Sequence, residues 1–490
     1  MQTVNTIADY LENNISKGRF VYEIETGAKK SFGEIYETAC RRVSGLALEP
    51  GSVVSVVLPN SIEYVEYFIA SMLGGWVFNP LPYFTQSQEL GKILSYVTPS
   101  LLVTDREDIK IEYSEKYNVL DQPKYISEPT GLRKVVHDPE IPAALYYSSG
   151  TTGNPKGVLY SHKNMVSLIS SIIRGFSFTD NDKQLAFLPF GHTASINYNI
   201  LPALMVGCDL YISKGFENLR GQFFKVLSDY KITYTEIVPT VLFMLNKLNV
   251  DISNLDLSSV GFIGCGSSSL PLGSQIEFTK KYKIPIANLY GLSETGPSHV
   301  DDPRKPGWSP GSIGKPLDVN ECKIAKDGEI LLKGDNVFVG YYKNMKLYDE
   351  VIKDGWFYTG DLGEERDGKC FFIDRKKDLI IRGGINIVPM EVEEVIYGHP
   401  EVLECAVVGM ISKLHGEEIA AVIVTKNINV DKKKITREVL NICKQNLSSY
   451  KSPKKIYFWE SIPKTPSKKI MRRKVGEAIN AELYHDPMKI

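Results

Sequence analysis

The chain has 490 residues, of which 43% are hydrophobic and 23% are charged, and its formal net charge is −1. This length exceeds what one hydrophobic core usually serves, so we expect two or more domains. A charge balance this close to zero gives no reason to expect nucleic acid or an anionic membrane as the principal partner. The seven cysteines are scattered, odd in number and without a C-x-x-C pair, which indicates a reducing compartment.

Targeting and membrane segments are not expected either. The first twelve residues contain neither the basic stretch nor the apolar stretch of a signal peptide. The most apolar window, residues 68–83, is interrupted by two glycines, an asparagine and two prolines, which break it too often for a bilayer span. We therefore expect a cytoplasmic protein with no integral membrane segment.

Between residues 51 and 290, short β-branched or aromatic runs alternate with longer amphipathic ones. Apolar residues at helical spacing predict helices within 62–73, 164–173, 219–229 and 273–282. Strands are predicted at 53–58, 101–104, 144–147, 183–188, 232–238, 260–263 and 284–290. Strands separated by helices predict parallel sheets with covered faces, and hence an α/β domain.

After residue 315 the pattern changes to short strands joined by Gly and Asp turns, as in 328–334 and 367–374. It predicts a β-rich subdomain at about 315–375. A smaller α+β unit follows, in which Pro389 suits the first turn of a helix and Gly398 with Pro400 can end it. With a boundary near Lys377, residues 1–375 form a large domain and residues 376–490 a small C-terminal one.

The segment 147–158 places three glycines, several hydroxyl side chains and a lysine in one turn between strand-like sequences. Glycines permit close backbone approaches, so amide groups can converge on an anion, while the hydroxyls and the lysine add donors and charge. The loop is no Walker A motif, because a glycine rather than Ser or Thr follows Lys156. A Gly/Ser surface turn is the alternative. The predicted phosphate-binding residues are Ser148, Ser149, Gly150, Thr151, Thr152, Gly153 and Lys156.

Four further segments stand out, and they are residues 288–297, 358–361, 374–391 and 463–473. They read NLYGLSETGP, YTGD, DRKKDLIIRGGINIVPME and PKTPSKKIMRR. Together with the glycine-rich loop, their order and spacing resemble the adenylate-forming superfamily of acyl- and aryl-CoA synthetases, peptide-synthetase adenylation domains and beetle luciferases. The resemblance covers nearly the whole chain, and it implies ATP, Mg²⁺ and CoA as the cofactors and cosubstrates.

The resemblance implies a nucleotide site at the carboxyl end of the strand that leads to Tyr290, where open α/β sheets place ligands. Tyr290 would stack on adenine, Glu294 would hold Mg²⁺, and Asp361 would accept hydrogen bonds from the ribose hydroxyls, with Arg375 donating nearby. Taken singly, these residues could be a core tyrosine, a helix cap or a Gly-Asp turn. The other implied nucleotide-binding residues are Gly266, Asn288, Leu289, Gly291, Ser293, Thr295 and Ile373.

The implied first reaction is attack of a carboxylate on the α-phosphorus of ATP, in which two anions must meet, so charge neutralisation and positioning dominate. By similarity, Lys469 is aimed at the α-phosphate. The family motif reads Ser/Thr-Gly-Lys-Ile, and this chain has Lys468 in place of the glycine. Two alternatives stay open: Lys468 shares the role, or residues 464–474 form a solvated basic surface.

Relatives imply an acyl pocket lined by apolar or weakly polar residues, which suits an aryl or medium-length acyl group. His192 matches a catalytic histidine that lies beside the reacting carboxylate in CoA ligases, although a structural histidine is the alternative. Gly191 and His192 stand where peptide-synthetase domains place an aspartate for the substrate amine, so an α-amino acid is disfavoured. Segment 264–271 departs from the family pattern but keeps Gly266. The implied pocket residues are Phe190, His192, Ser195, Val238, Ser267 and Leu289.

In the superfamily the small domain turns about a hinge after adenylation and presents a tunnel for a thiol. The matching hinge is Lys377, and Gly383 and Gly384 would line the tunnel, where a pantetheine arm passes close to backbone. We expect the partners to be a small-molecule carboxylic acid and CoA, in a monomer or homodimer. A stand-alone enzyme that loads an acyl-carrier protein is the alternative within enzymes, and a nucleotide-binding module without catalysis is the third hypothesis.

Overall fold

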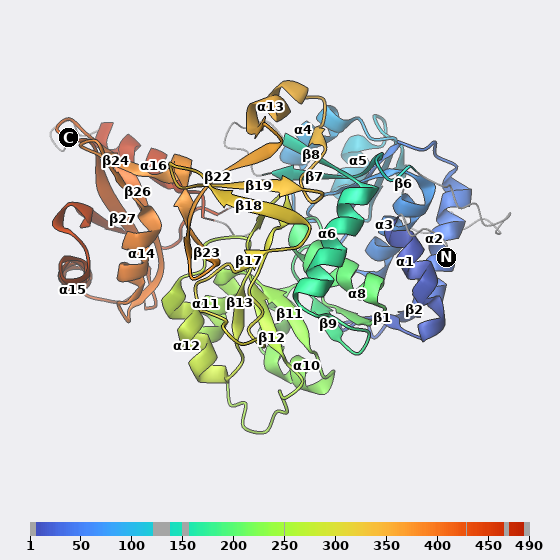
Figure 1. Ribbon diagram of the computed structural model, residues 1–490, viewed down its shortest axis with the longest axis horizontal. Coiled ribbons are helices and arrows are strands. Elements are labelled where there is room, and N and C mark those ends of the chain that lie inside the picture. Colours follow the sequence, from blue (N-terminus) through green and yellow to red (C-terminus); the bar gives the residue numbers. More distant parts are fainter. Residues whose placement is uncertain are drawn as a thin grey trace.

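The computed structural model describes residues 6–120, 138–148, 156–248, 250–427, 429–464 and 470–484. Figure 1 shows the small C-terminal part beside a much larger body that holds the N-terminus. Residues from Ile380 onward form their own sheet and hydrophobic clusters, as expected for a separate α+β unit. The division at 375/376 stays a prediction.

The large body contains two sheets of seven strands, and most neighbouring strands in each are parallel, as predicted. The first sheet has the order β20 (Gly340–Tyr341), β8 (Lys156–Ser161), β7 (Pro142–Ser148), β4 (Val77–Pro80), β3 (Val53–Val57), β5 (Leu101–Thr104) and β6 (Val119–Leu120). The second has the order β13 (Ile286–Asn288), β12 (Phe262–Cys265), β11 (Tyr234–Ile237), β9 (Lys183–Ala186), β10 (Asp209–Ile212), β1 (Phe20–Glu23) and β2 (Lys29–Ser31).

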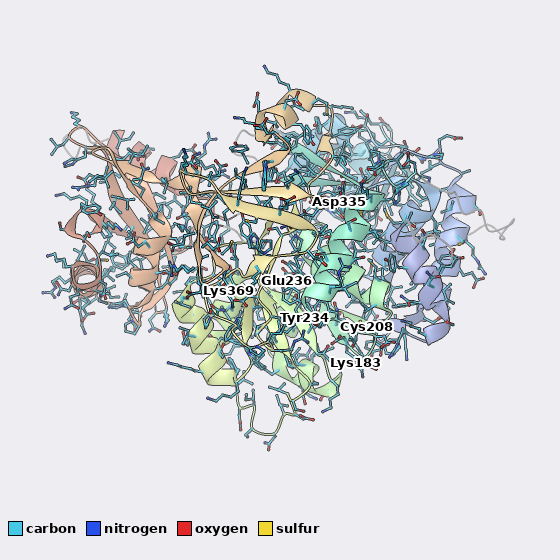
Figure 2. The ribbon with its side chains drawn as sticks, viewed as in Figure 1. Lys183, Cys208, Tyr234, Glu236, Asp335 and Lys369 are labelled. Carbon is cyan, nitrogen blue, oxygen red and sulfur yellow. The ribbon has the colours of Figure 1, made fainter. Side chains whose placement is uncertain are left out.

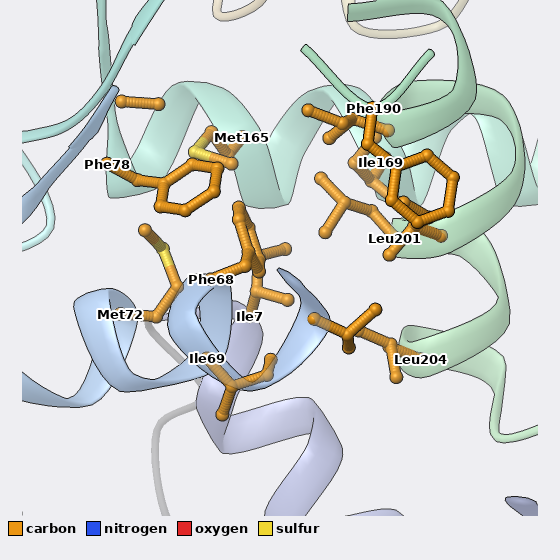
Figure 3. Packing of buried hydrophobic residues seen from close by; sticks show 14 of the residues in the cluster. Ile7, Phe68, Ile69, Met72, Phe78, Met165, Ile169, Phe190, Leu201 and Leu204 are labelled. Carbon is orange, nitrogen blue, oxygen red and sulfur yellow. The ribbon is translucent and has the colours of Figure 1, made fainter. Parts of the chain in front are cut away.

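Apolar helices pack together into a shared core of the large body. Figure 3 shows Phe68 and Met72 near Met165, and Phe190 near Leu201. Each fully buried side chain of this kind contributes about 1.5–3 kcal/mol relative to an exposed one. The helices concerned are α1 (Ile7–Asn14), α3 (Ile62–Gly74), α6 (His162–Gly175) and α8 (Leu201–Val206).

Most predicted elements are present with shifted ends. The predicted helix at 219–229 is divided, because Gly221 lies between a short α9 (Phe216–Leu219) and α10 (Phe223–Asp229). Helix α12 (Leu272–Tyr282) matches its prediction within one residue, and so does α3, whose first turn is capped by the Ser61 side chain. The chain before residue 51 was given no elements, yet it contributes β1, β2, α1 and α2 (Phe32–Leu46).

The strands predicted at 328–334 and 367–374 are present in an antiparallel sheet. It contains β18 (Asn320–Ile324), β19 (Glu329–Gly334), β21 (Ile352–Lys353), β22 (Trp356–Arg366) and β23 (Lys369–Arg375). In Figure 1 this sheet lies between the small C-terminal part and the rest of the large body. It therefore supplies the last strand before the small domain begins.

The small domain packs helices on a sheet of mixed direction. Its strands are β24 (Ile380–Arg382), β25 (Ile385–Ile387), β26 (Val402–Ser412), β27 (Gly416–Thr425) and β28 (Lys455–Phe458). Its helices are α14 (Pro389–Tyr397), which begins at Pro389 as predicted, α15 (Lys432–Asn446) and α16 (Arg472–Tyr484).

Within the described part of the chain, none of the helices combines the length and apolar character that crossing a membrane requires.

Candidate active site

The glycine-rich segment begins and ends in a β-hairpin. Ser148, the last residue of β7, pairs with Lys156, the first of β8. Gly157 is packed against Leu145 and Tyr342 so closely that a Cβ there would lie 2.8 Å from a Leu145 methyl carbon. The five residues Ser149, Gly150, Thr151, Thr152 and Gly153 lie outside the described residues. The β7–β8 hairpin nevertheless holds Ser148 and Lys156, which flank this segment, next to each other.

Ser293 ties the second motif to this hairpin. Its hydroxyl donates to the Tyr147 carbonyl oxygen at 3.3 Å, and its own carbonyl oxygen accepts from the Tyr160 hydroxyl at 3.0 Å. The next residue, Glu294, is buried, and its Oε1 accepts from the Tyr341 hydroxyl at 2.9 Å. Two motifs that are distant in sequence thus meet at the base of the loop.

Glu294 has the chemistry that a magnesium ion requires. Among the described residues its Oε2 receives no hydrogen bond, so this oxygen is available to a hard cation. A different cluster lies behind Tyr290, where the ligand atoms of His299, Cys322 and Cys370 lie within 4.8 Å of one another. Thiols and imidazole are poor ligands for Mg²⁺, so Glu294 is the residue that fits the predicted metal.

Tyr290, Asp361 and Arg375 come together at the predicted ribose end. The Tyr290 hydroxyl donates to Asp361 Oδ2 at 2.9 Å, and Arg375 Nε lies 3.7 Å from Asp361 Oδ1. Asp361 and Arg375 are also paired across β22 and β23. Burial, followed by the nearby Asp361 carboxylate, raises the pKa of Tyr290 well above its usual range, so the phenol keeps its proton and its donor role.

Lys377 lies close to this group. Partial burial of its ammonium group, followed by the charge of Arg375, lowers its pKa, and Asp361 and Lys156 also interact with it electrostatically. The predicted hinge, the ribose acid and the end of the phosphate loop are therefore neighbours. This convergence does not follow from any single segment.

Asp374 connects the two domains, and sequence reasoning gave it no role. Its buried carboxylate accepts from the Met390 amide at 3.0 Å and lies 3.7 Å from Arg472. Arg472 also forms an ion pair with buried Glu393 at 2.7 Å. The signal for Asp374 was its place at the start of the charged run 374–378.

The predicted adenylation residue Lys469 and its neighbour Lys468 lie outside the described residues. The chain on either side of them is held together, because Lys464 and Ile470 form a β-bridge and the Met471 amide donates to the Pro463 carbonyl oxygen at 2.9 Å. The described residues on either side of this segment therefore lie next to each other in the small domain.

The Pro189–Thr193 turn is built against the first sheet. Phe190 is buried, its amide donates to Asn60 Oδ1 at 2.9 Å, and its carbonyl oxygen accepts from the Tyr64 hydroxyl at 2.5 Å. The Ser195 hydroxyl donates to the Leu188 carbonyl oxygen at 3.1 Å. His192 is partly buried at the start of α7 (Thr193–Ser195). Their roles in an acyl pocket stay predictions.

The other predicted pocket residues and the predicted nucleotide-binding residue Gly266 lie at the carboxyl ends of β11, β12 and β13. Val238 follows β11, Gly266 follows β12, and Leu289 follows β13. A Cβ on Gly266 would lie 2.7 Å from the Leu289 carbonyl oxygen, so only glycine fits this approach. Ser267 has a positive φ of 72°, which is rare for a residue with a side chain.

The remaining implied nucleotide-binding residues lie in or after β13 or in β23, and the implied tunnel residues are the exception. Asn288 donates from Nδ2 to the Gly311 carbonyl oxygen at 3.2 Å, Thr295 donates to the Gly296 carbonyl oxygen at 2.8 Å, and Ile373 lies in β23. Gly291 is covered closely by the Gly296 carbonyl. The exception is Gly383–Gly384, which forms the turn between β24 and β25 with φ of 57° and 81° and contacts His415 of the small domain.

Comparison with known proteins agrees with this geometry. A family model described as AMP-binding enzyme matches residues 12–342, and one described as AMP-binding enzyme C-terminal domain matches residues 391–469. The chain is 30% identical to the sulfoacetate–CoA ligase of Cupriavidus necator over 92% of this chain and 93% of that protein. It is 30% identical to 4-coumarate–CoA ligase 1 of Narcissus pseudonarcissus over 93% and 90%.

Solved structures give the same result for the fold. The o-succinylbenzoate CoA synthetase of Bacillus subtilis, in complex with its acyl-adenylate intermediate, superimposes with a TM-score of 0.84 and 27% identity over 95% of this chain and 97% of that one. The anthranilate CoA ligase AuaEII superimposes with a TM-score of 0.90 and 23% identity over 98% of each chain, a likeness of fold alone. Because the first family model covers well over half of the residues, this chain belongs to the AMP-binding enzyme family.

Proposed function

We propose that this enzyme converts a carboxylic acid and ATP to an acyl-adenylate and pyrophosphate, and then transfers the acyl group to the thiol of CoA with release of AMP. The observation that carries the proposal is the convergence of Lys156, Glu294, Asp361 and Lys377 at one edge of the large domain. It depends on the contact of Ser293 with the β7–β8 hairpin and on the electrostatic interactions of Lys377 with Asp361 and Lys156. Membership of the AMP-binding enzyme family supports it.

The first step joins two anions, so this chain's residues must reduce their repulsion. Amides of the glycine-rich loop and Lys156 act on the phosphates, and Lys469 acts on the α-phosphate. Asp361 and Arg375 hold the ribose, which fixes the α-phosphorus relative to the acid. Mg²⁺, held by Glu294, neutralises phosphate charge when bound. A carboxylate oxygen forms a bond to the α-phosphorus, and the bond to pyrophosphate breaks.

The second step transfers the acyl group. The thiolate of CoA attacks the carbonyl carbon, a C–S bond forms, and the C–O bond to AMP breaks. Rotation about Lys377 would remove Lys469 and bring the Gly383–Gly384 turn to the site. Such a rotation must alter the contacts of Asp374 with Met390 and Arg472.

The acid is an aryl or medium-chain acyl acid without an α-amino group. Gly191 supports the absence of an amino group, because a Cβ at that position would lie 2.2 Å from the Pro82 nitrogen, and no aspartate fits there without a backbone shift. Packing therefore excludes an aspartate at position 191 that would neutralise a substrate ammonium, and position 192 carries a histidine instead.

The test uses the purified protein with ATP, Mg²⁺, CoA and a panel of aryl and aliphatic acids. We expect AMP, pyrophosphate and an acyl-CoA thioester in equal amounts for at least one acid. Release of ADP would contradict the proposal. Formation of AMP with an acylated carrier protein, but without thioester from free CoA, would favour the carrier-loading alternative.

A further inference from the structure

Glu236 is a buried carboxylic acid that neither the fold nor the proposed chemistry explains. It lies in the middle of β11 and is 1% exposed. Among the described residues it forms no ion pair, and its Oε2 has no hydrogen-bond partner. Figure 2 labels Glu236 and Tyr234 close to each other in the large body, and both side chains are buried. A buried carboxyl oxygen without a partner costs free energy, so it calls for a functional reason.

The sheet around Glu236 carries small side chains. Glu236 pairs with Gly264 on β12, and Gly264 pairs in turn with Ala287 on β13. On the other side, β9 ends with Ala186, two residues beyond the partner of Tyr234. Since side chains alternate along a strand, these three residues share the face of Glu236. The positions of the neighbouring strands that flank Glu236 therefore carry no large side chain of their own.

Two tyrosine hydroxyls accompany the acid. Tyr234 lies on the same face of β11, and its hydroxyl reaches the level of Gly264, where a Cβ would lie 2.7 Å from it. Tyr198 comes from η2 (Ile196–Ile200), which packs against β11. Both tyrosines interact electrostatically with Glu236, and both hydroxyls are buried without a hydrogen-bond partner among the described residues.

This polar group borders the predicted acyl pocket. The Leu289 side chain lies directly over Gly264, so that a Cβ on Gly264 would lie 2.6 Å from Leu289 Cδ1. Gly266, the next residue on that face of β12, lies under the Leu289 backbone. Glu236 therefore lies on β11 two residues before the predicted pocket residue Val238, level with Gly264 on β12, which lies two residues before Gly266. It is on the side away from the carboxyl edge where the nucleotide site is predicted.

We infer that Glu236, Tyr198 and Tyr234 form the deep end of the acyl pocket and bind an uncharged hydrogen-bonding group, a hydroxyl or a neutral amine, at the far end of the substrate acid. The inference rests on the proposed function and narrows its substrate class. The same geometry disfavours a purely hydrocarbon tail, which would leave three buried polar groups unsatisfied.

The protonation state agrees with a neutral ligand. Burial raises the pKa of Glu236 to about 8, so at pH 7 the carboxyl group is mainly protonated and both donates and accepts. The hydroxyls of Tyr198 and Tyr234 can likewise both donate and accept hydrogen bonds. Among the described residues no Lys or Arg forms an ion pair with Glu236, so a second carboxylate on the substrate would meet no opposite charge there.

The experiment compares pairs of acids that differ only in one distal group: benzoate with 3- and 4-hydroxybenzoate and 4-aminobenzoate, and octanoate with 8-hydroxyoctanoate. For wild type we expect kcat/KM in pyrophosphate release to favour one polar member by about 10-fold or more, since a site built for a hydrogen bond rejects the analogue that lacks it. Glu236→Leu should remove the preference, through KM for the polar acid, while activity with the apolar acid persists.

Two further variants separate recognition from folding. Tyr198→Phe removes one hydroxyl only, and should reduce the preference several-fold. Thr235→Val is the matched control, because Thr235 is buried on the opposite face of β11 and donates to the Leu185 carbonyl oxygen at 2.8 Å. It should leave the preference unchanged. An unaltered preference in both Glu236→Leu and Tyr198→Phe would overturn the inference. It would indicate that these three residues bind internal water instead of substrate.

Binding is measured separately from turnover. Each acid is converted to its acyl-sulfamoyl adenosine, and the rise in melting temperature is recorded with wild type and Glu236→Leu. A larger rise for the polar member that is lost in Glu236→Leu supports the inference even if no acid is adenylated, in which case only the proposed function fails. Equal rises for both members contradict the inference.

Discussion

The two ends of the site are built in opposite ways. At the predicted nucleotide end, each of the two carboxylates accepts a hydrogen bond from a tyrosine before any ligand arrives: Tyr290 donates to Asp361 and Tyr341 donates to Glu294, both at 2.9 Å. At the proposed acyl end, Glu236 Oε2 and the hydroxyls of Tyr198 and Tyr234 are buried without hydrogen-bond partners among the described residues. The first arrangement suits a ligand that never changes, and the second leaves unsatisfied groups that one chosen substrate can satisfy.

The largest expected effect concerns charge at the nucleotide end. Lys469→Ala should lower the rate of adenylate formation by about 10³-fold or more, because it removes the cation aimed at the developing charge on the α-phosphate. Conversion of supplied acyl-adenylate and CoA to thioester should remain within a few-fold of wild type. Single-turnover assays of both half-reactions measure this.

The control for that variant is Lys474→Ala, an exposed lysine of the same basic segment. It should leave both half-reactions unchanged. Equal loss of both half-reactions in Lys469→Ala would show that the assigned role is wrong.

The ribose acid should have the next largest effect. Asp361→Ala removes a charged acceptor, so we expect kcat/KM for ATP to fall by about 10- to 100-fold, the equivalent of about 1.5–3 kcal/mol. The preference among acids should stay the same, because the change lies at the other end of the site. Exposed Asp367→Asn serves as the control. A changed acid preference in Asp361→Ala would mean that the two ends are not independent.

The acyl end should make stability depend on pH. The pKa of Glu236 is raised to about 8 in the fold and is near 4.5 when unfolded, so between these values the folded state binds the extra proton. Its contribution to the free energy of unfolding therefore falls as pH rises, by about 1.4 kcal/mol per unit, and is constant above pH 8.

Urea unfolding of wild type and Glu236→Gln at pH 5.5, 6.5 and 7.5 measures that slope as the difference between the two proteins. The difference should move in favour of Glu236→Gln with rising pH. Glu321→Gln, at an exposed position in β18, should show no such trend. A difference that does not vary with pH would mean that Glu236 is ionised or solvated.

The smallest expected effect again concerns the nucleotide end. Tyr341→Phe removes the hydroxyl that donates to Glu294, and should raise the concentration of Mg²⁺ needed for half-maximal activity by a few-fold. The acid preference should not change. A fall in activity that excess Mg²⁺ does not reverse would argue against Glu294 as the magnesium ligand.

Periodicity and motifs predicted much of this molecule from sequence. The α/β fold with parallel sheets and the α+β C-terminal unit are confirmed, and the resemblance to the adenylate-forming superfamily is confirmed by the family match. Strands such as β5 were predicted to the residue, because β-branched and apolar runs between turn residues carry the signal. The assigned roles of the site residues stay predictions.

What the sequence did not reveal depends on contacts between distant segments. Asp374 joins β23 to α14 and α16, and no local pattern shows that Met390 and Arg472 meet it. Glu236 lies in a strand whose sequence reads as an ordinary buried run. The inference about its role depends on the glycine and alanine that lie beside it on β12 and β13. Such residues become visible only when strand register is known.

The central claim is that a carboxylate oxygen of the substrate bonds to the α-phosphorus of ATP. An acid labelled with ¹⁸O in both carboxylate oxygens, turned over with ATP and CoA, tests this directly by mass spectrometry of the nucleotide product. The account predicts AMP that carries one ¹⁸O atom. Label in inorganic phosphate with release of ADP, or AMP without label, would contradict it.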